Sequence, residues 1–434
     1  MIAGLARCKQ GKIIGIILHG SGMAKDNSRF FERKQAWSRV KDRLLLSYLP
    51  QYFQKVLKTR RPIFYVDCFA GKGRFDDGEP GSPCIALDIR KDVLAKSTAE
   101  APRIDTCFID KNYESELRES TKDYIDADSC GTKAIVGGKY EEEILPLLAK
   151  HRDENVFLYI DPYGIKALDF QLFAKSVSFG AASFEMLINM NSFGFIRAAC
   201  RALGVACDEI DVEDIVEYDP TEFDSTDQSA SLLDSIAGGG YWREIILRYR
   251  REKEDNSSAG YEAEAAFSQA YKQRLRKIFS YVLDMPIRLK RGGQPKYRLI
   301  HATNHPDGCN LMADNMMSRS SELLVSIQNR CQMDLFEQDV ENRIVDAREI
   351  YEKAKELLGR TVAPKRMSHF TAEFFTEFGV ICSTGDVFAA MKALEDEKRV
   401  LVRRNPPTTS TGRPSVFFTD GKNGQTVTIR RNQA

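Results

Sequence analysis

The feature that most constrains this chain is an apolar run that ends in an acid and then a Gly-x-Gly turn, at residues 64–74. Gly71 and Gly73 lack a Cβ, so they let the backbone turn tightly and approach a bound group closely. Asp67 stands at the carboxyl end of the expected strand, which is where open α/β sheets bind their ligands. The segment therefore predicts an α/β fold whose first strand leads into a site for a nucleotide-like ligand.

Apolar runs of strand length recur along the first three hundred residues and alternate with helical stretches, as βαβ units require. We expect parallel strands at 63–68, 104–109, 133–136, 156–160 and 184–190. Ahead of them, residues 29–58 have the spacing of one amphipathic helix or of two linked helices. Two later runs, at 278–284 and 296–303, predict an antiparallel pair. These elements together predict a Rossmann-like sheet of the methyltransferase type with helical insertions.

The totals are those of an ordinary globular protein. At 434 residues, with 43% hydrophobic and 29% charged residues, the chain should form two or more domains. A formal net charge of +1 gives no overall basic field, and no apolar run approaches the roughly 18 residues that cross a bilayer. The ten cysteines contain no Cys-x-x-Cys pair, and His301 and His305 lie at a strand end and in a loop. We therefore expect a cytoplasmic protein with reduced thiols and no metal site.

Shifts in composition divide the chain into segments. We expect an N-terminal extension at 1–28, a Rossmann domain at 29–320 with a helical insertion at about 205–277, a helical linker at 321–358, and a winged-helix domain at 359–434. Residues 208–227 hold ten acids and no Lys or Arg. This acidic stretch indicates either a solvated loop or a contact surface for a basic partner.

The expected C-terminal domain ends in a basic hairpin. Residues 385–399 have helical spacing, with Asp386 as the expected cap, and apolar runs at 400–404 and 415–418 predict the two strands. From 398 to 431 there are eight Lys and Arg residues against one acid. A helix followed by a hairpin is typical of a winged helix. Its basic hairpin would contact phosphates, although winged helices also serve as protein-interaction or dimerisation units. The candidate nucleic-acid contacts are Lys392, Arg399, Arg403, Arg404 and Arg413.

Polar residues at the ends of three expected strands together indicate a site for S-adenosylmethionine (SAM). The turn at 67–73 would wrap the methionine and ribose portions of the cofactor. Asp110 ends the next strand, where an acid accepts hydrogen bonds from ribose hydroxyls. The third strand end carries Asp161, Pro162 and Tyr163. A carboxylate and the Pro162 carbonyl would accept the N–H bonds of an exocyclic amine, and the tyrosine ring would stack on a flipped base.

The motifs resemble those of the three-Cys-motif partner protein family, whose members look like SAM-dependent methyltransferases and are named for a gene neighbour with a three-cysteine motif. The matching positions are Phe31, Trp37, Ser38, Lys41, Leu45, Tyr48, Leu49 and Pro50, the segments 65–73, 77–83, 108–110, 159–164 and 299–303, and Gly308 and Met312. The resemblance covers roughly residues 29–320. The order of parts is also similar, more distantly, to bacterial adenine-N6 methyltransferases that act on ribosomal RNA.

The resemblance implies roles for particular residues. Asp67, Ala70, Gly71 and Gly73 would form the SAM loop, and Asp110 would be the ribose acid. Lys41 would lie on the helix before the first strand and help to hold the cofactor, or else be a solvated helix lysine. The tetrad at 161–164 departs from the Asp-Pro-Pro-Tyr pattern of the adenine enzymes, because Gly164 takes the place of the stacking aromatic residue. That departure counts against adenine as the substrate.

Two classes of function remain open. The first is a methyltransferase that modifies an amino group of a nucleic-acid base and docks through the winged helix. The second is a catalytically inactive scaffold or DNA-binding partner of a three-cysteine-motif protein, acting in defence against mobile elements. A NAD-dependent oxidoreductase is disfavoured, because Asp76 stands where the third glycine of Gly-x-Gly-x-x-Gly would be.

Overall fold

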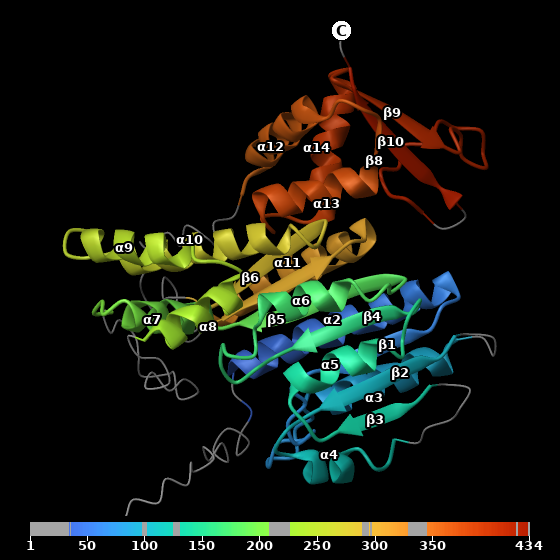
Figure 1. The fold of residues 1–434 in the computed structure, drawn as a ribbon. Helices are drawn as coiled ribbons and strands as arrows, with labels where there is room; N and C mark the ends of the chain where they lie inside the picture. Colours follow the sequence, from blue (N-terminus) through green and yellow to red (C-terminus); the bar gives the residue numbers. More distant parts are fainter. Residues whose placement is uncertain are drawn as a thin grey trace, which may run out of the picture.

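A seven-stranded sheet forms the centre of the molecule, with helices on both of its faces (Figure 1). The computed structural model describes residues 34, 36–97, 102–124, 131–207, 226–288, 295, 297–328, 345–421 and 424–432. The expected N-terminal extension at 1–28 and most of the acidic stretch at 208–227 lie outside these residues.

The sheet has the strand order β3-β2-β1-β4-β5-β7-β6. Its strands are β1 (Ile63–Asp67), β2 (Ile104–Ile109), β3 (Lys133–Val136), β4 (Asn155–Ile160), β5 (Ser183–Met190), β6 (Tyr281–Ile287) and β7 (Tyr297–Thr303). The first five strands are parallel, and β7 lies antiparallel between β5 and β6. The strands predicted for this sheet from apolar runs are therefore confirmed, including the late antiparallel pair. This mixed, mostly parallel sheet fits a Rossmann-like methyltransferase fold.

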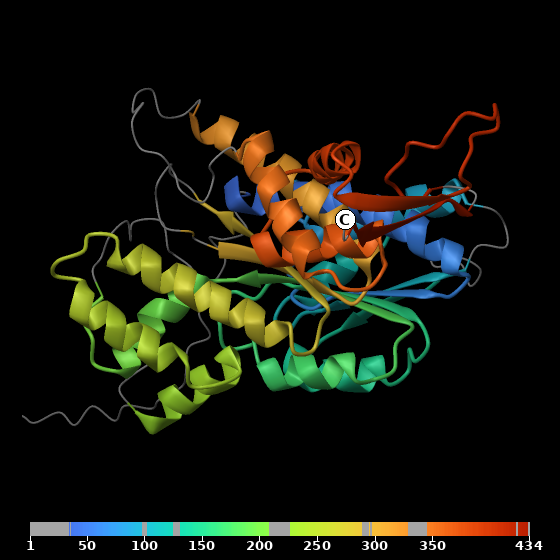
Figure 2. The same ribbon diagram turned by 90° about the horizontal axis from the view of Figure 1, so that it is seen from above.

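Helices cover both faces of the sheet, which is why its strands appear in the sequence as continuous apolar runs. In β1, Ile63 and Tyr65 pack into the hydrophobic core on one face, and Phe64 and Val66 into the core on the other. The first face is covered by α2 (Ala36–Val56), α3 (Ser82–Ala95), α4 (Glu114–Ser120) and α11 (Pro306–Gln328), and the second by α5 (Tyr140–Leu148), α6 (Phe170–Val177) and α7 (Ser192–Ala202). Figure 2 shows α2 and α11, in blue and gold, across the sheet from the green α6.

Three helices between β5 and β6 lie where the insertion was expected. They are α8 (Asp227–Ala237), α9 (Trp242–Glu252) and α10 (Ala259–Leu275). Gly238 ends α8 in the left-handed region, at φ 67°, where a glycine carries no steric cost. Phe267 of α10 stacks on Phe195 of α7, with ring centroids 4.0 Å apart. The insertion therefore extends the core on the α7 side of the sheet.

The C-terminal unit combines helices with a small antiparallel sheet of order β8-β10-β9. Its elements are α12 (Ala347–Arg360), β8 (Lys365–Arg366), α13 (Met367–Phe378), α14 (Thr384–Asp396), β9 (Val400–Asn405) and β10 (Thr426–Arg431). α12 packs against α14 and so belongs to this unit, whereas we expected residues up to 358 to form a linker. The residues 329–344 between α11 and α12 lie outside the described part of the chain.

Two details of this unit differ from the sequence prediction. Residues 415–418 form no strand, and β9 pairs instead with β10, because Val427 and Ile429 alternate with polar residues and supply the inward face. The cap of α14 is Ser383 rather than Asp386. Asp386 is the N3 residue of a capping box, in which it accepts the backbone N–H of Ser383 at 2.9 Å.

The C-terminal unit is fastened to the main body at several points. Asn310 of α11 donates to the carbonyl of Ser368 at 2.9 Å, and the Tyr281 hydroxyl lies 2.9 Å from Nδ1 of His369. The core on the α2 face also continues into α13 and α14 without a break. The unit is therefore an integral part of the fold rather than a module on a flexible tether.

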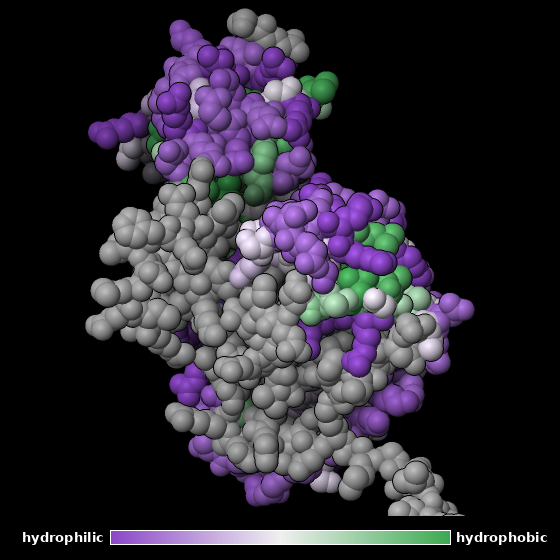
Figure 3. Space-filling model, turned by 90° about the vertical axis from the view of Figure 1, so that its left-hand side faces the viewer, coloured by the Kyte–Doolittle hydropathy of each residue, from purple (hydrophilic) through white to green (hydrophobic). Residues whose placement is uncertain are grey.

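On the side of the molecule that lies to the left in Figure 1, the C-terminal unit and the main body differ in surface hydropathy. Figure 3 shows that the C-terminal unit, at the top, is mostly hydrophilic there, with a hydrophobic area lower down on the main body. Within the described residues, no helix combines the length and the apolar character that a membrane crossing needs.

Candidate cofactor site

A hollow opens at the carboxyl ends of β1 and β4, beside the turn that follows β1. The strand order reverses between these two strands, since β2 and β3 extend on one side of β1 and β5 lies beyond β4. Open α/β sheets bind their ligands at such a reversal. Most of the residues predicted for the site line the hollow: Lys41, Ala70, Gly71, Gly73, Asp161, Pro162 and Tyr163.

The turn after β1 needs its glycines. Gly71 and Gly73 have φ angles of 61° and 79°, which disfavour other residues. A Cβ on Gly73 would also overlap Oγ of Ser120, which donates to the carbonyl of Lys72 at 2.6 Å. The turn is therefore held close against the end of α4, and its backbone lines one wall of the hollow.

Asp110 supports this turn from behind. One of its carboxylate oxygens accepts the backbone N–H of Gly71 at 2.8 Å, and the other accepts those of Asn112 and Tyr113 at 2.8 and 2.9 Å. Asp110 is buried and is not among the residues that line the hollow. A carboxylate has about four acceptor positions, so three bonds to the backbone leave room for one more.

Asp67 lies beneath the turn as a buried acceptor. One carboxylate oxygen accepts the backbone N–H of Phe69 at 3.3 Å, and the other has no hydrogen-bond partner among the described residues. Burial raises the pKa of Asp67 to about 7, although the nearby Ser82 side chain and the Phe69 backbone N–H oppose that rise. A fully buried carboxylate oxygen without a donor is costly, and it marks a place where a ligand could donate a hydrogen bond.

Asp161 is surrounded by donors from three elements. Lys41 of α2 donates from Nζ to both carboxylate oxygens, at 2.6 and 2.8 Å. Asn189 of β5 donates from Nδ2 at 2.7 Å, and the Tyr159 hydroxyl donates at 3.1 Å. Four bonds occupy about all the acceptor positions of a carboxylate. The side chain of Lys41 is only 8% exposed, so the solvated-lysine interpretation is wrong.

The hollow is also lined by residues that were not predicted as part of the site, among them Ser38, Asp42, Asn189 and Tyr297. The spacing of Ser38, Lys41 and Asp42 places them on one face of a helix, which is a signal that the sequence contained. Burial raises the pKa of Asp42 to about 6, while its ion-pair partner Lys34 lowers it. The Nζ atom of Lys41 also lies 5.6 Å from the centre of the Tyr297 ring.

The residues predicted to contact nucleic acid differ in whether they form ion pairs within the C-terminal unit. Arg404 donates to both carboxylate oxygens of Glu395, at 2.7 and 2.9 Å, and its guanidinium lies 4.8 Å from the centre of the Phe418 ring. Lys392 and Arg399 pair with Asp396 and Glu397. Arg403 and Arg413 are exposed, and neither has an ion-pair partner among the described residues. Arg404 is thus engaged within the unit, whereas Arg403 and Arg413 face solvent.

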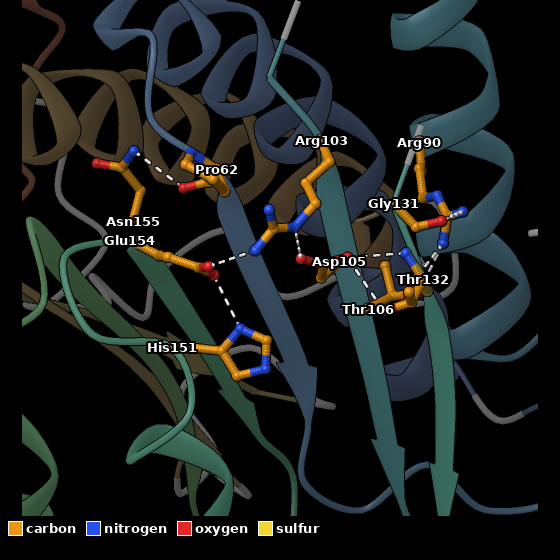
Figure 4. Close-up of polar contacts among 10 residues, drawn as sticks. All are labelled: Pro62, Arg90, Arg103, Asp105, Thr106, Gly131, Thr132, His151, Glu154 and Asn155. Carbon is orange, nitrogen blue, oxygen red and sulfur yellow. Dashed lines mark hydrogen bonds and ion pairs between the residues drawn. The ribbon is translucent and has the colours of Figure 1, made fainter. Parts of the chain in front are cut away.

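Asp105, His151 and Glu154 form a cluster at the amino ends of the strands, opposite the hollow. Their potential ligand atoms all lie within 4.8 Å of one another (Figure 4). Arg103 lies between the two acids and donates to Asp105 at 2.6 Å and to Glu154 at 2.7 Å. His151 also stacks on Phe64, with ring centroids 3.6 Å apart. The guanidinium supplies the positive charge that a metal ion would bring, so the cluster joins the beginnings of β2 and β4 as an ion-pair network.

No protein-family model and no curated protein matches the chain. One similar solved structure is the plantazolicin methyltransferase BamL in complex with a triazolic desmethylPZN analog and SAH. The two chains are 9% identical over an alignment that covers 64% of this chain and 94% of the methyltransferase chain, with a TM-score of 0.25. Another is Trm1 from Pyrococcus horikoshii with S-adenosyl-L-methionine, at 8% identity, 77% and 88% coverage, and a TM-score of 0.32. Similarities at this level carry no argument about the fold, ligand or substrate of this chain.

Proposed function

We propose that the hollow binds SAM and that the chain is a SAM-dependent methyltransferase. The observation that carries the proposal is the hollow itself, which opens where the strand order reverses and is lined by the glycine turn and by the Lys41–Asp161 pair. SAM has an ammonium group, a carboxylate and ribose hydroxyls, and it supplies an electrophilic methyl group on a sulfonium. Asp67 would accept from the ammonium group, Lys41 would pair with the carboxylate, and Asp110 would accept from the ribose. The unsatisfied oxygen of Asp67 supports this fit.

The acceptor we propose is an amino group of a nucleic-acid base. Asp161, Pro162 and Tyr163 follow β4 at the same hollow, where a carbonyl and a ring could position a flipped base. Lys41, Asn189 and Tyr159 hold the Asp161 carboxylate in one orientation. We propose that Asp161 anchors this group of side chains and that the Pro162 carbonyl accepts an N–H of the substrate.

The C-terminal unit would dock the nucleic acid. Its order of helix, strand, helix, helix, strand, strand is that of a winged helix, and its final hairpin carries exposed arginines. We propose that this unit supplies affinity through phosphate contacts, which weaken steeply with salt.

A second candidate function is a scaffold that keeps the fold without methyl transfer and acts beside a three-cysteine-motif protein. The observation that favours it is the complete engagement of Asp161 by Lys41, Asn189 and Tyr159, which leaves that carboxylate little capacity to accept from a substrate amine.

An assay of radiolabelled methyl transfer from SAM distinguishes the methyltransferase from the scaffold. The protein would be incubated with DNA, RNA and protein fractions, and label retained in each fraction would be counted. We expect label in a nucleic-acid fraction, and we expect Asp161→Asn to abolish it. Asp153→Asn is the matched control, because Asp153 is 88% exposed and far from the hollow. SAM binding without label in any fraction would contradict the enzyme and support the scaffold. Label in the protein fraction alone would contradict the nucleic-acid acceptor.

A further inference from the structure

The outer face of the β8-β10-β9 sheet carries a set of arginines. Alternate residues of a strand share a face, and residues directly opposite one another in neighbouring strands share it too. Thr428 of β10 pairs with Arg403 of β9 on one side and with Arg366 of β8 on the other. Arg430 lies two residues beyond Thr428 and so belongs to the same face. Since neighbouring strands lie about 4.8 Å apart, the Cα atoms of Arg403 and Arg366 are about 10 Å apart.

This outer face is positively charged and exposed. Arg366, Arg403 and Arg430 are all exposed, and the other outward residues of β9 and β10 are uncharged. In the described part of the chain, Arg403 and Arg430 have no ion-pair partner, and Arg366 has Asp420 at 3.2 Å. The inward residue Arg404, by contrast, is neutralised by Glu395. The sheet therefore separates arginines that hold the fold from arginines that face solvent.

Helix α14, which follows α13 as the third helix of the unit, is poorly placed to enter a nucleic-acid groove. Its first residue, Thr384, donates from its backbone N–H and its hydroxyl to Asp314 of α11, both at 2.8 Å. Its exposed side chains include Asp386 and Asp396, and Lys392 is paired with the latter. An anchored amino end and an acidic exposed face both oppose approach to phosphates.

We propose that the outer face of the β8-β10-β9 sheet, through Arg366, Arg403 and Arg430, binds the sugar-phosphate backbone of a nucleic acid without reading its sequence. The choice of partner rests on the proposed function, and the choice of surface rests on the strand register and the charge. Guanidinium groups bind phosphate through paired, charge-assisted hydrogen bonds. Contacts to phosphate fix the position of a nucleic acid and carry no sequence information, so any recognition of the target base must come from the hollow in the main body.

The test measures binding of fluorescently labelled oligonucleotides by anisotropy over a series of salt concentrations. Single-stranded and double-stranded probes of mixed sequence are used with the full-length protein. Arg403→Gln with Arg430→Gln should reduce the slope of log K against log salt by roughly 1.4 for a single-stranded probe and roughly 1.8 for a duplex. The loss of affinity should be the same for probes of unrelated sequence.

The matched control is Lys392→Gln with Arg399→Gln, which removes the same charge from residues that are paired within the unit. We expect this control to keep the wild-type slope. Equal effects of the two double variants, an unchanged slope, or no binding of either probe by the wild type would overturn the proposal. Equally tight binding of polyglutamate would also overturn it and indicate an acidic protein partner. Calorimetric titration with SAM, run on all variants, separates this proposal from the cofactor assignment, because neither double variant lies near the hollow.

Discussion

Replacing Asp67 by asparagine should make the stability of the protein fall less as the pH rises, provided that no ligand is bound. Burial raises the pKa of Asp67 from 3.8 to about 7 in the folded protein. Between those two pKa values, the folded state holds a proton that the unfolded state has lost, so the free energy of unfolding falls as the pH rises. Asparagine has no such proton, and the variant should lack this part of the pH dependence.

The size of the effect follows from the pKa difference. A rise in pKa from 3.8 to about 7 lowers the free energy of unfolding by roughly 4 kcal/mol, fully above about pH 7 and not at all below about pH 4. Between about pH 5 and about pH 8, the stability of Asp67→Asn relative to the wild type should therefore increase by roughly 3 kcal/mol. Only the change with pH is predicted, because the substitution also alters the contacts of this side chain with Ser82 and with the Phe69 backbone N–H.

Urea unfolding of the wild type and the variant at several pH values, followed by circular dichroism, measures this difference. Other groups titrate equally in both proteins and cancel from the comparison. The same variant should bind SAM much more weakly, because the acceptor for the ammonium group has lost its charge. Parallel stability profiles for the two proteins would refute the argument that a buried, ionisable carboxylate lies under the turn.

Three other substitutions have defined outcomes. Gly73→Ala should lower the free energy of unfolding by roughly 1 to 3 kcal/mol and weaken SAM binding, because of its φ angle and its overlap with Ser120; wild-type stability in urea would contradict this. Arg298→Met should cost roughly 3 to 5 kcal/mol in the same assay, because Arg298 donates to buried Glu264 and Asp284 at 2.7 Å; a cost under roughly 1 kcal/mol would show that the pairs are dispensable. Lys41→Met should cost roughly 1 to 3 kcal/mol, since it leaves Asp161 without its counter-charge, and adding Asp161→Asn should restore part of it. A double variant less stable than Lys41→Met would contradict this pairing.

The sheet was predictable from the sequence because its strands are buried on both faces. Residues 63–67 and 155–160 are apolar throughout most of their length, so pattern alone identifies them. The C-terminal strands are half-exposed. The same reasoning identified 400–404, which is confirmed as β9, but misassigned its partner strand. The run at 415–418 looked like a strand because it is apolar, but Phe418 packs beneath Arg404 instead. Polar strand β10 was missed because its alternation is interrupted by arginines at its exposed end.

The candidate site was predictable at the level of strand ends and not at the level of contacts. Asp67, Asp110 and Asp161 were expected at one edge of the sheet, and the structure places them there. Their partners depend on tertiary packing, because Lys41 and Asp161 are 120 residues apart in the sequence. No local pattern announces that a helix before the first strand will neutralise an acid after the fourth. The same limit applies to Arg404, whose partner Glu395 lies on the preceding helix.

The most direct test of the account is calorimetric titration of the wild-type protein with SAM and with its demethylated product. The account predicts that both bind at micromolar concentration with a stoichiometry of one per chain, and that Gly73→Ala weakens both. Asp76→Ala is the control, because Asp76 is half-exposed, pairs with Lys72 and lies outside the residues that line the hollow. Failure of the folded wild-type protein to bind either compound would contradict the central claim that this hollow is a SAM site.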